Sequence, residues 1–377
     1  MAKDTRRKLL ASALSLFSER WYETVSIAEI CRNAKLSNGV FYRYFKDKES
    51  LFLEILFEFL EKFEADLAVV GQRDSVRENL VEFVTITVGV ARRYGREVSV
   101  FREGQYRFLD LERQLRDMYM SALRRVFGRT LDEAEYLYVM GGVRFLATRN
   151  IYDAVEVDEA LLANLILDGV FGDGTVPESA DPGASEAPLD FGDASPSRIR
   201  LAEAGMTLFG ERGYYDVGVS EICLAAGLSV GTFYQHFATK DEFLDYLVRV
   251  IGHSVRYYLS CADLSGNRLR REVVGMGHFV RYFAARPEFY SIVRQAEFVT
   301  ETWVRDYYDR FESGYLRNLG FGSGTQARTV ANFLMGLSHY LGIEVIFSDR
   351  TGDLNGLLAT LGGFLRNGID PDGGERT

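Results

Sequence analysis

The stretch SNGVFYRYFKDKES, residues 37–50, places four aromatic side chains among three basic ones. A similar stretch, SVGTFYQHFATKDE, returns at residues 229–242. Both belong to a longer repeat, because residues 17–48 align with residues 209–240 without a gap, at a constant offset of 192, with 16 of 32 positions identical. Weaker similarity continues downstream, which indicates that the whole chain is a tandem duplication.

The composition predicts a soluble globular chain of two or more domains, with 377 residues, 47% of them hydrophobic and 26% charged. Three cysteines and four histidines without metal-ligand spacing predict no disulfide framework, metal or cofactor. We expect a cytoplasmic protein without a membrane span, since no apolar run reaches about 18 residues. No nucleophile elbow, phosphate loop or paired carboxylates occur, so an enzyme is not expected.

Each copy is predicted to be helical nearly throughout, which makes the fold class all-α. Ser26 and Glu29 stand at capping-box spacing, and Ser37 and Ser229 are predicted to cap the helix that follows. Two short helices around a tight turn, behind a longer first helix, form a helix-turn-helix. Apolar residues recur at helical spacing in the first helix of each copy, at Leu9, Leu10, Ala13, Leu16 and Phe17, then at Leu201, Ala202, Gly205, Leu208 and Phe209.

Both copies resemble the DNA-binding domain of the tetracycline-repressor (TetR) family of bacterial regulators. The resemblance rests on Gly39-x-Phe41-Tyr42-x-x-Phe45 and Gly231-x-Phe233-Tyr234-x-x-Phe237, each followed by a lysine. It implies that each DNA-binding domain is followed by a helical domain for effector binding and dimerisation. The predicted parts are helix-turn-helix domains at 1–50 and 197–244, effector and dimerisation domains at 51–171 and 245–369, a flexible linker at 172–196 and a polar tail at 370–377.

The resemblance also implies which residues meet DNA, with the start of each recognition helix at base edges and tyrosine and lysine at phosphates. The predicted DNA-binding residues are Ser26, Lys35, Ser37, Asn38, Gly39, Val40, Tyr42, Arg43, Tyr44 and Lys48 in the first copy, and Ser229, Val230, Gly231, Thr232, Tyr234, Gln235, His236 and Lys240 in the second. For Arg43 and Gln235, a merely solvated surface is the alternative. The repeated phenylalanines, with Cys31 and Cys223, are predicted to be buried.

One residue departs from the family pattern. The family usually has glycine in the turn, as at Gly227, whereas the first copy has Lys35. If this position requires a positive φ, the lysine costs on the order of 1 kcal/mol. It also adds a cation near the predicted DNA face.

The two helix-turn-helix domains differ in charge. Residues 1–50 hold ten Lys or Arg against six Asp or Glu, whereas residues 197–244 hold four against six. Nonspecific affinity for DNA scales with the number of phosphates neutralised. The first copy is therefore predicted to bind DNA more tightly than the second.

The middle helices of each copy are rich in aromatic residues with polar residues between them, which suits a pocket for a small ligand. Core packing is the alternative for these aromatics. The predicted pocket residues are Phe101, Arg102, Tyr106, Tyr119, Arg144, His278, Tyr282, Arg294, Trp303 and His339. The last helices are predicted to pair the two copies as an internal pseudo-dimer, helped by small residues such as Gly141, Gly142 and Gly336. A homodimer of duplicated chains is the alternative.

These features predict a cytoplasmic transcriptional regulator, a repressor that leaves its double-stranded DNA operator when a small hydrophobic or aromatic effector binds. The alternative is that the acidic second head no longer binds DNA and acts as a sensor or protein-interaction module.

Overall fold

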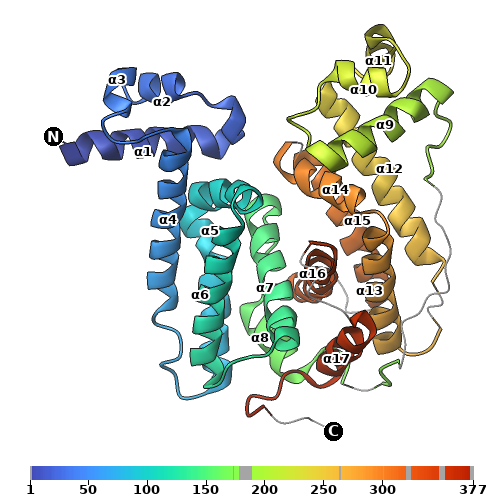
Figure 1. Cartoon of the computed structure of the whole chain (residues 1–377). Helices are drawn as coiled ribbons and strands as arrows, with labels where there is room; N and C mark the ends of the chain where they lie inside the picture. Colours follow the sequence, from blue (N-terminus) through green and yellow to red (C-terminus); the bar gives the residue numbers. More distant parts are fainter. Residues whose placement is uncertain are drawn as a thin grey trace. The chain divides into compact units, whose positions relative to one another are not determined.

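The computed structural model describes residues 2–172, 174–177, 189–262, 265–299, 301–319, 324–347 and 353–373. Within these residues the regular elements are all helices and none is a strand, which confirms the predicted all-α class (Figure 1). None of the helices in this part of the chain is both long enough and apolar enough to cross a membrane.

The two copies contain similar series of helices, although one long helix of the first copy corresponds to two helices in the second. The first copy contains α1 (Ala2–Glu19), the 3-10 helix η1 (Tyr22–Thr24), α2 (Ile27–Asn33), α3 (Asn38–Phe41), α4 (Lys48–Leu67), α5 (Val76–Arg107), α6 (Leu109–Phe127), α7 (Glu133–Asp153) and α8 (Glu159–Asp168). The second contains α9 (Pro196–Arg212), α10 (Val219–Ala225), α11 (Val230–His236), α12 (Lys240–Ser260), α13 (Arg268–Ala284), α14 (Pro287–Val299), α15 (Glu301–Leu319), α16 (Thr325–Phe347) and α17 (Leu354–Asn367).

The offset of 192 residues persists well beyond the similar sequence. It relates the first residues of α4 and α12, of α5 and α13, of α6 and α15, and of α7 and α16. The duplication therefore holds at the level of helices even where few residues are identical.

The chain divides into two compact units that do not coincide with the two copies. One unit comprises Met1–Leu131, Ala147–Ala154 and Pro371–Gly373, and the other comprises the rest, including α8 and the first part of α7. The predicted boundary at residue 171 follows the repeat, whereas the compact units follow the pairing of helices. The last helices of the first copy thus pack with the second copy.

Within the second unit, the ends of α8 and α17 exchange backbone hydrogen bonds. The Val170 N–H donates to the Leu365 carbonyl oxygen at 2.7 Å, and the Ile369 N–H donates to the Ile166 carbonyl oxygen at 2.9 Å. Each copy thus supplies one donor and one acceptor at matching positions. This reciprocity is typical of the interface of a two-fold symmetric dimer.

Glycines bring α7 and α16 close together in the same unit. A Cβ atom on Gly142 would lie 2.1 Å from Cδ2 of Phe333, and one on Gly336 would lie 2.5 Å from the Gly141 carbonyl oxygen. The fully buried Tyr138 joins the pairs, since its hydroxyl lies 3.0 Å from the carbonyl oxygens of both Leu165 and Phe364. Larger residues at these glycines would push the paired helices apart.

The turn after α2 is built in the same way in both copies. The Leu36 N–H donates to the Cys31 carbonyl oxygen at 2.8 Å, and the Leu228 N–H donates to the Cys223 carbonyl oxygen at 2.8 Å. Such a helix ending requires a left-handed residue between them. Lys35 has φ 57° and Gly227 has φ 64°, so the lysine does adopt the conformation that favours glycine.

We expect Lys35→Gly to stabilise the first helix-turn-helix by about 0.5–1 kcal/mol, because relief of the left-handed strain exceeds the extra chain entropy of glycine. Gly227→Lys is the matched reverse change and should destabilise the second by a similar amount. Hydrogen exchange of peptides from α2–α3 and α10–α11 measures both. Unchanged protection in both variants would contradict the assigned strain.

Candidate nucleic-acid interface and ligand cavity

The phenylalanines of the repeat form the cores of the two helix-turn-helix heads. Phe41 and Phe233 are fully buried, and Phe45 and Phe237 are nearly so. Cys31 and Cys223 are buried beside them, and burial raises the pKa of both thiols. The predictions of core phenylalanines and buried thiols are confirmed, and the cysteines favour the thiol over the reactive thiolate.

The recognition helices begin as predicted but differ in length. In α11 the Ser229 hydroxyl accepts a hydrogen bond from the Thr232 N–H at 3.1 Å, as predicted for a cap. Ser37 is the N-cap residue of α3, as predicted, but its side chain makes no capping hydrogen bond. After Phe41 the chain continues in turns, with the Tyr44 N–H donating to the Phe41 carbonyl oxygen at 2.9 Å.

Most of the predicted DNA-binding side chains lie at the protein surface. Tyr42 is 61% exposed and Tyr234 55%, which is high for rings of this size. A tyrosine hydroxyl can donate to a phosphate oxygen, and the contact of these two residues with DNA stays a prediction. Also exposed are Lys35, Ser37, Asn38, Gly39, Arg43, Ser229, Val230, Gly231 and Gln235, whereas Val40, Tyr44, Thr232 and His236 are half-buried.

Some predicted DNA-binding residues have partners within the protein. The Ser26 hydroxyl accepts from the Glu29 N–H at 3.2 Å, which completes the predicted capping box. Nε2 of His236 lies 2.7 Å from Oγ of Ser197 at the start of α9. These contacts fix the two side chains, and their roles at DNA stay predictions.

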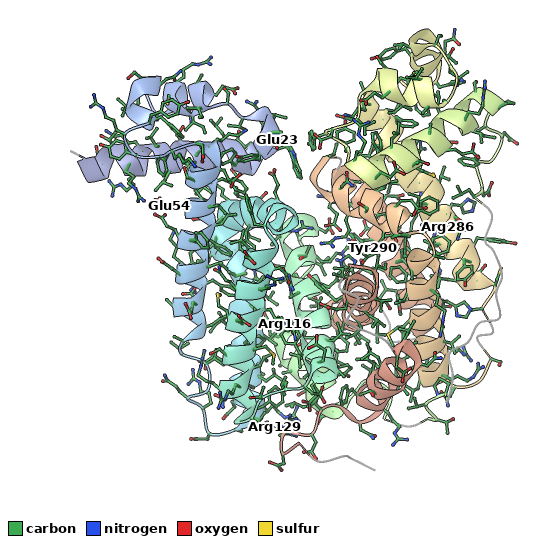
Figure 2. The ribbon with its side chains drawn as sticks, in the orientation of Figure 1. Glu23, Glu54, Arg116, Arg129, Arg286 and Tyr290 are labelled. Carbon is green, nitrogen blue, oxygen red and sulfur yellow. The ribbon has the colours of Figure 1, made fainter. Side chains whose placement is uncertain are left out.

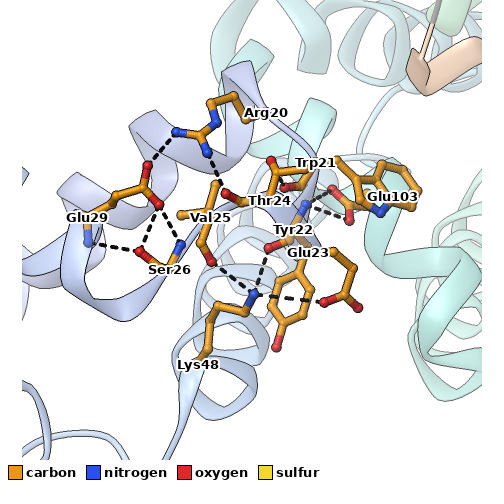
Figure 3. A network of polar contacts seen from close by, with 10 residues as sticks. All are labelled: Arg20, Trp21, Tyr22, Glu23, Thr24, Val25, Ser26, Glu29, Lys48 and Glu103. Atoms are coloured by element: carbon orange, nitrogen blue, oxygen red, sulfur yellow. Dashed lines mark hydrogen bonds and ion pairs between the residues drawn. The ribbon is translucent and has the colours of Figure 1, made fainter. Parts of the chain in front are cut away.

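Lys48 and Lys240 tie the first loop of each head to the helix that leaves it. The Lys48 ammonium donates to the carbonyl oxygens of Tyr22 and Val25 at 2.8 and 2.9 Å and lies 4.0 Å from the centre of the Tyr22 ring (Figure 3). The Lys240 ammonium makes the equivalent bonds to Tyr214 and Val217 at 2.7 and 2.8 Å. Both lysines therefore have an internal role, and a phosphate contact stays a prediction.

An ion pair holds the same loop from its other side. Nη1 of Arg20 lies 2.8 Å from Oε1 of Glu29 (Figure 3). The hydrogen bonds that Glu29 accepts from Arg20 and from the Ser26 N–H lower the pKa of Glu29 to about 2. In the second copy Arg212 lies 2.8 Å from Glu221 in the same way. The loop before the helix-turn-helix is thus fixed in both heads.

Two residues that the sequence did not single out for this role connect each head to its middle helices. The Glu103 carboxylate on α5 accepts from the Tyr22 N–H at 3.0 and 3.1 Å (Figure 3). At the equivalent position on α14, Oε1 of Gln295 accepts from the Tyr214 N–H at 2.6 Å. Polar residues occur at both of these positions, which are separated by the repeat offset of 192, and this recurrence could have identified them.

The difference in charge between the heads is concentrated on the helix-turn-helix itself. Four exposed cations of the first head correspond, at the offset of 192, to uncharged residues in the second. Arg32, Lys35, Arg43 and Lys46 correspond to Leu224, Gly227, Gln235 and Ala238. By contrast, the shared cations Arg20 and Arg212, like Lys48 and Lys240, are engaged within the protein.

Gly39 and Gly231 are not required by packing within the heads. A Cβ atom on Gly39 would meet no atom within 4 Å, and one on Gly231 would meet only Oγ of Ser229 at 3.6 Å. Neither residue has a positive φ. The absence of a side chain instead leaves the first turn of each recognition helix open to close approach from outside.

The second unit also contains a cavity of about 600 Å³, lined mainly by α12, α13, α14, α15 and α16 and also by Phe145 and Phe171 of the first copy. This volume suits a small organic ligand. Its wall includes Tyr290, which is labelled in Figure 2, and His339. Nδ1 of His339 lies 2.9 Å from the Tyr290 hydroxyl.

Of the predicted pocket residues, His339 lines this cavity. Buried core positions are occupied by Phe101, Tyr119, His278 and Tyr282, in line with the core alternative. The Arg144 guanidinium lies 4.9 Å from the centre of the Tyr340 ring. Arg102 and Arg294 are half-buried, while the side chains of Tyr106 and Trp303 lie outside the described residues.

The sequence profile of bacterial regulatory proteins of the tetR family matches residues 9–55 and again residues 201–247. These two matches cover both heads. Both heads are DNA-binding domains of the tetR family, which the chain therefore contains twice. The predicted family resemblance and tandem duplication are thereby confirmed.

Individual tetR-family relatives match over short parts of the chain. The HTH-type transcriptional regulator HbdR of Aromatoleum sp. (strain CIB) is 34% identical over 67 residues, which cover 18% of this chain and 29% of that protein. The regulator AcrR of Shigella flexneri is 34% identical over 103 residues, covering 24% of this chain and 46% of that protein. The matches span less than half the length of these curated relatives.

Among solved structures, the regulator FadR of Bacillus subtilis in complex with stearoyl-CoA is 17% identical. The match covers 46% of this chain and 99% of that chain, with a TM-score of 0.39.

Gly39→Ala tests whether this tetR-type head meets DNA at its open first turn. Alanine should stabilise the head by about 0.5 kcal/mol through its helix propensity. It should also weaken DNA binding about tenfold if the helix backbone approaches the major groove. Thermal unfolding and fluorescence anisotropy with selected duplex DNA measure the two effects.

Gly89→Ala on α5 is the matched control, because a Cβ atom there would also meet no atom within 4 Å. It should leave DNA affinity unchanged. Equal DNA affinity for Gly39→Ala and Gly89→Ala would remove the assigned role of Gly39.

Proposed function

We propose that the protein is a DNA-binding transcriptional regulator, a repressor that leaves its double-stranded operator when a small hydrophobic or aromatic effector binds. The observation that carries the ligand response is the position of α14 in the second unit. Tyr290 and Val293 on this helix line the cavity. Two residues further on, Gln295 accepts from the backbone of the loop between α9 and α10.

One helix therefore contacts both the cavity and the head. The Gln295 amide also donates to the Phe209 carbonyl oxygen at 3.3 Å, so it holds the end of α9 as well as the loop after it. A ligand that favours another position of α14 would act on this loop, and through it on Lys240. A ligand changes DNA affinity only by its differential affinity for the two head positions.

Gln295→Ala should uncouple the two sites. Binding of a ligand selected by thermal shift from a small-molecule panel should be retained, while its effect on DNA affinity, typically about 5–150-fold, should fall severalfold. Anisotropy titrations of selected duplex DNA with and without ligand measure this. Gln295→Glu keeps an acceptor like that of Glu103 and is the control. Undiminished coupling in Gln295→Ala would contradict the proposed route.

The heads are proposed to contribute unequally to DNA binding. Support comes from the four exposed cations of the first head, each of which could neutralise a phosphate, against uncharged residues in the second. The predicted tyrosine contacts are available to both heads, since Tyr42 and Tyr234 are similarly exposed. Charge therefore distinguishes the heads more than the recognition residues do.

Exchanging charges between the heads tests this proposal. Arg43→Gln with Lys46→Ala should weaken binding and reduce the slope of log affinity against log salt by about 1.8. The reverse exchange, Gln235→Arg with Ala238→Lys, should tighten binding. Anisotropy with selected duplex DNA at about 50–200 mM salt measures both. Unchanged affinity and salt slope after Arg43→Gln with Lys46→Ala would contradict the proposed difference between the heads.

The paired helices support an internal pseudo-dimer as the DNA-binding form. The reciprocal bonds of Val170 and Ile369 and the contact of Gly142 with Phe333 join the two copies within one chain. A dimer of duplicated chains, with four heads, is the alternative. The mass of protein bound to one operator in solution distinguishes the two models. One chain of about 43 kDa per operator supports the internal pseudo-dimer.

A second function is favoured by the apolar surface of the second head. Leu224 is 82% exposed where the first copy has Arg32, and Val230 is 40% exposed nearby in sequence. Such residues suit a protein-interaction module. If the reverse charge exchange in the second head leaves DNA binding unchanged, this reading of the second head is preferred.

A further inference from the structure

The cavity of the second copy has an excess of positive charge. Glu272 is the only carboxyl group among its described lining residues. The arginines that line it are Arg256, Arg268, Arg271, Arg310 and Arg317.

Arg256 is half-buried and, among the described residues, forms neither an ion pair nor a hydrogen bond. Nε of Arg310 pairs with Oδ2 of Asp306 at 2.6 Å, and Nε of Arg271 donates to the Gly266 carbonyl oxygen at 3.1 Å. Among the described residues Arg256 forms no ion pair, and its guanidinium carbon lies 5.9 Å from the centre of the Phe311 ring. The Asp306 carboxylate acts on Arg256 electrostatically but is already paired with Arg310. A half-buried cation without an ion pair of its own would favour an incoming anion.

Glu272 opposes an anion less than its formal charge suggests. The Tyr315 hydroxyl donates to Oε1 of Glu272 at 2.7 Å. Burial raises the pKa of this carboxyl to about 7, against the opposing effects of Tyr315 and Arg268. Near neutral pH the group is therefore partly protonated, and the cationic character of the wall dominates.

The rest of the wall suits an apolar body. The rings of Phe279, Tyr290, Tyr307 and Phe311 line the cavity, together with Val293. Aromatic side chains provide large apolar contact area with defined geometry. The cavity thus combines an apolar wall with a half-buried cation, Arg256, that has no ion pair among the described residues.

The first copy does not repeat this arrangement. At the offset of 192, which relates the starts of α4 and α12, Glu64 takes the place of Arg256. At the same offset Leu80 and Leu123, both fully buried, take the places of Glu272 and Tyr315. A carboxylate and two leucines would reject the anion that the second copy attracts.

We infer that the effector is an amphipathic organic anion, with an aromatic or aliphatic body, that binds in the second copy alone with its anionic group on Arg256. This inference rests on the proposed ligand response and names the chemical class of its ligand. The second copy, whose head has fewer cations, is then the copy that binds the effector.

Two fluorescent probes with the same rings test it. The sulfonate 8-anilino-1-naphthalenesulfonate carries an anionic group that N-phenyl-1-naphthylamine lacks. When each probe is titrated into the full-length protein, we expect one molecule of the sulfonate to bind per chain. Arg256→Met should weaken the binding of the sulfonate about tenfold or more, because a charge-assisted hydrogen bond is lost. The affinity for the neutral probe should change little.

Arg256→Lys, which keeps the charge, should restore part of the affinity for the sulfonate. Arg249→Met, an exposed arginine on the same helix that does not line the cavity, is the matched control and should change neither probe. Circular dichroism verifies that each variant remains folded.

The inference is overturned if the sulfonate does not bind, if Arg256→Met weakens both probes equally, or if two sites per chain titrate. The proposed function is judged separately, by DNA affinity in the presence of the probe. A sulfonate that binds through Arg256 without changing DNA affinity would support the ligand class and count against the ligand response.

Discussion

Two backbone hydrogen bonds at the ends of α8 and α17 define how the copies are joined. Val170 donates to Leu365 and Ile369 donates to Ile166, so each copy completes the helix end of the other. The carbonyl groups at helix ends need partners, and here the partner is the other copy. The close glycine contacts of α7 with α16 depend on the same arrangement. Without this pairing, the apolar faces of both copies would be left open to water.

Within this pairing the two copies have kept the same scaffold and diverged in chemistry. The internal bonds of Lys48 and Lys240 are nearly identical, as are the turns at Lys35 and Gly227. Backbone groups are the partners in these contacts, so side-chain changes elsewhere leave them intact. Surface cations in the first head and the cavity in the second copy lie outside this scaffold. Those positions could therefore change without disturbing the fold.

The sequence predicted the parts of the structure that depend on periodicity and local spacing. Core phenylalanines, the Ser26–Glu29 capping box and the helical class follow from such patterns. The internal role of Lys48 could not be predicted, because its acceptors are carbonyl groups that carry no sequence signal. Cavity residues were also hard to predict, since helical spacing does not distinguish a core ring such as Tyr282 from a ring on the cavity wall.

The reciprocal pairing also has a consequence for how such a chain behaves at low abundance. A dimer of separate subunits dissociates on dilution, and its DNA-binding form disappears with it. When both halves belong to one polypeptide, the local concentration of each half for the other is set by the connecting segment and not by expression level. A mutation in one copy is then not repeated in the other, whereas in a dimer of identical subunits it changes both. Tandem fusion thus permits a paired regulator at a few copies per cell, with each half free to specialise.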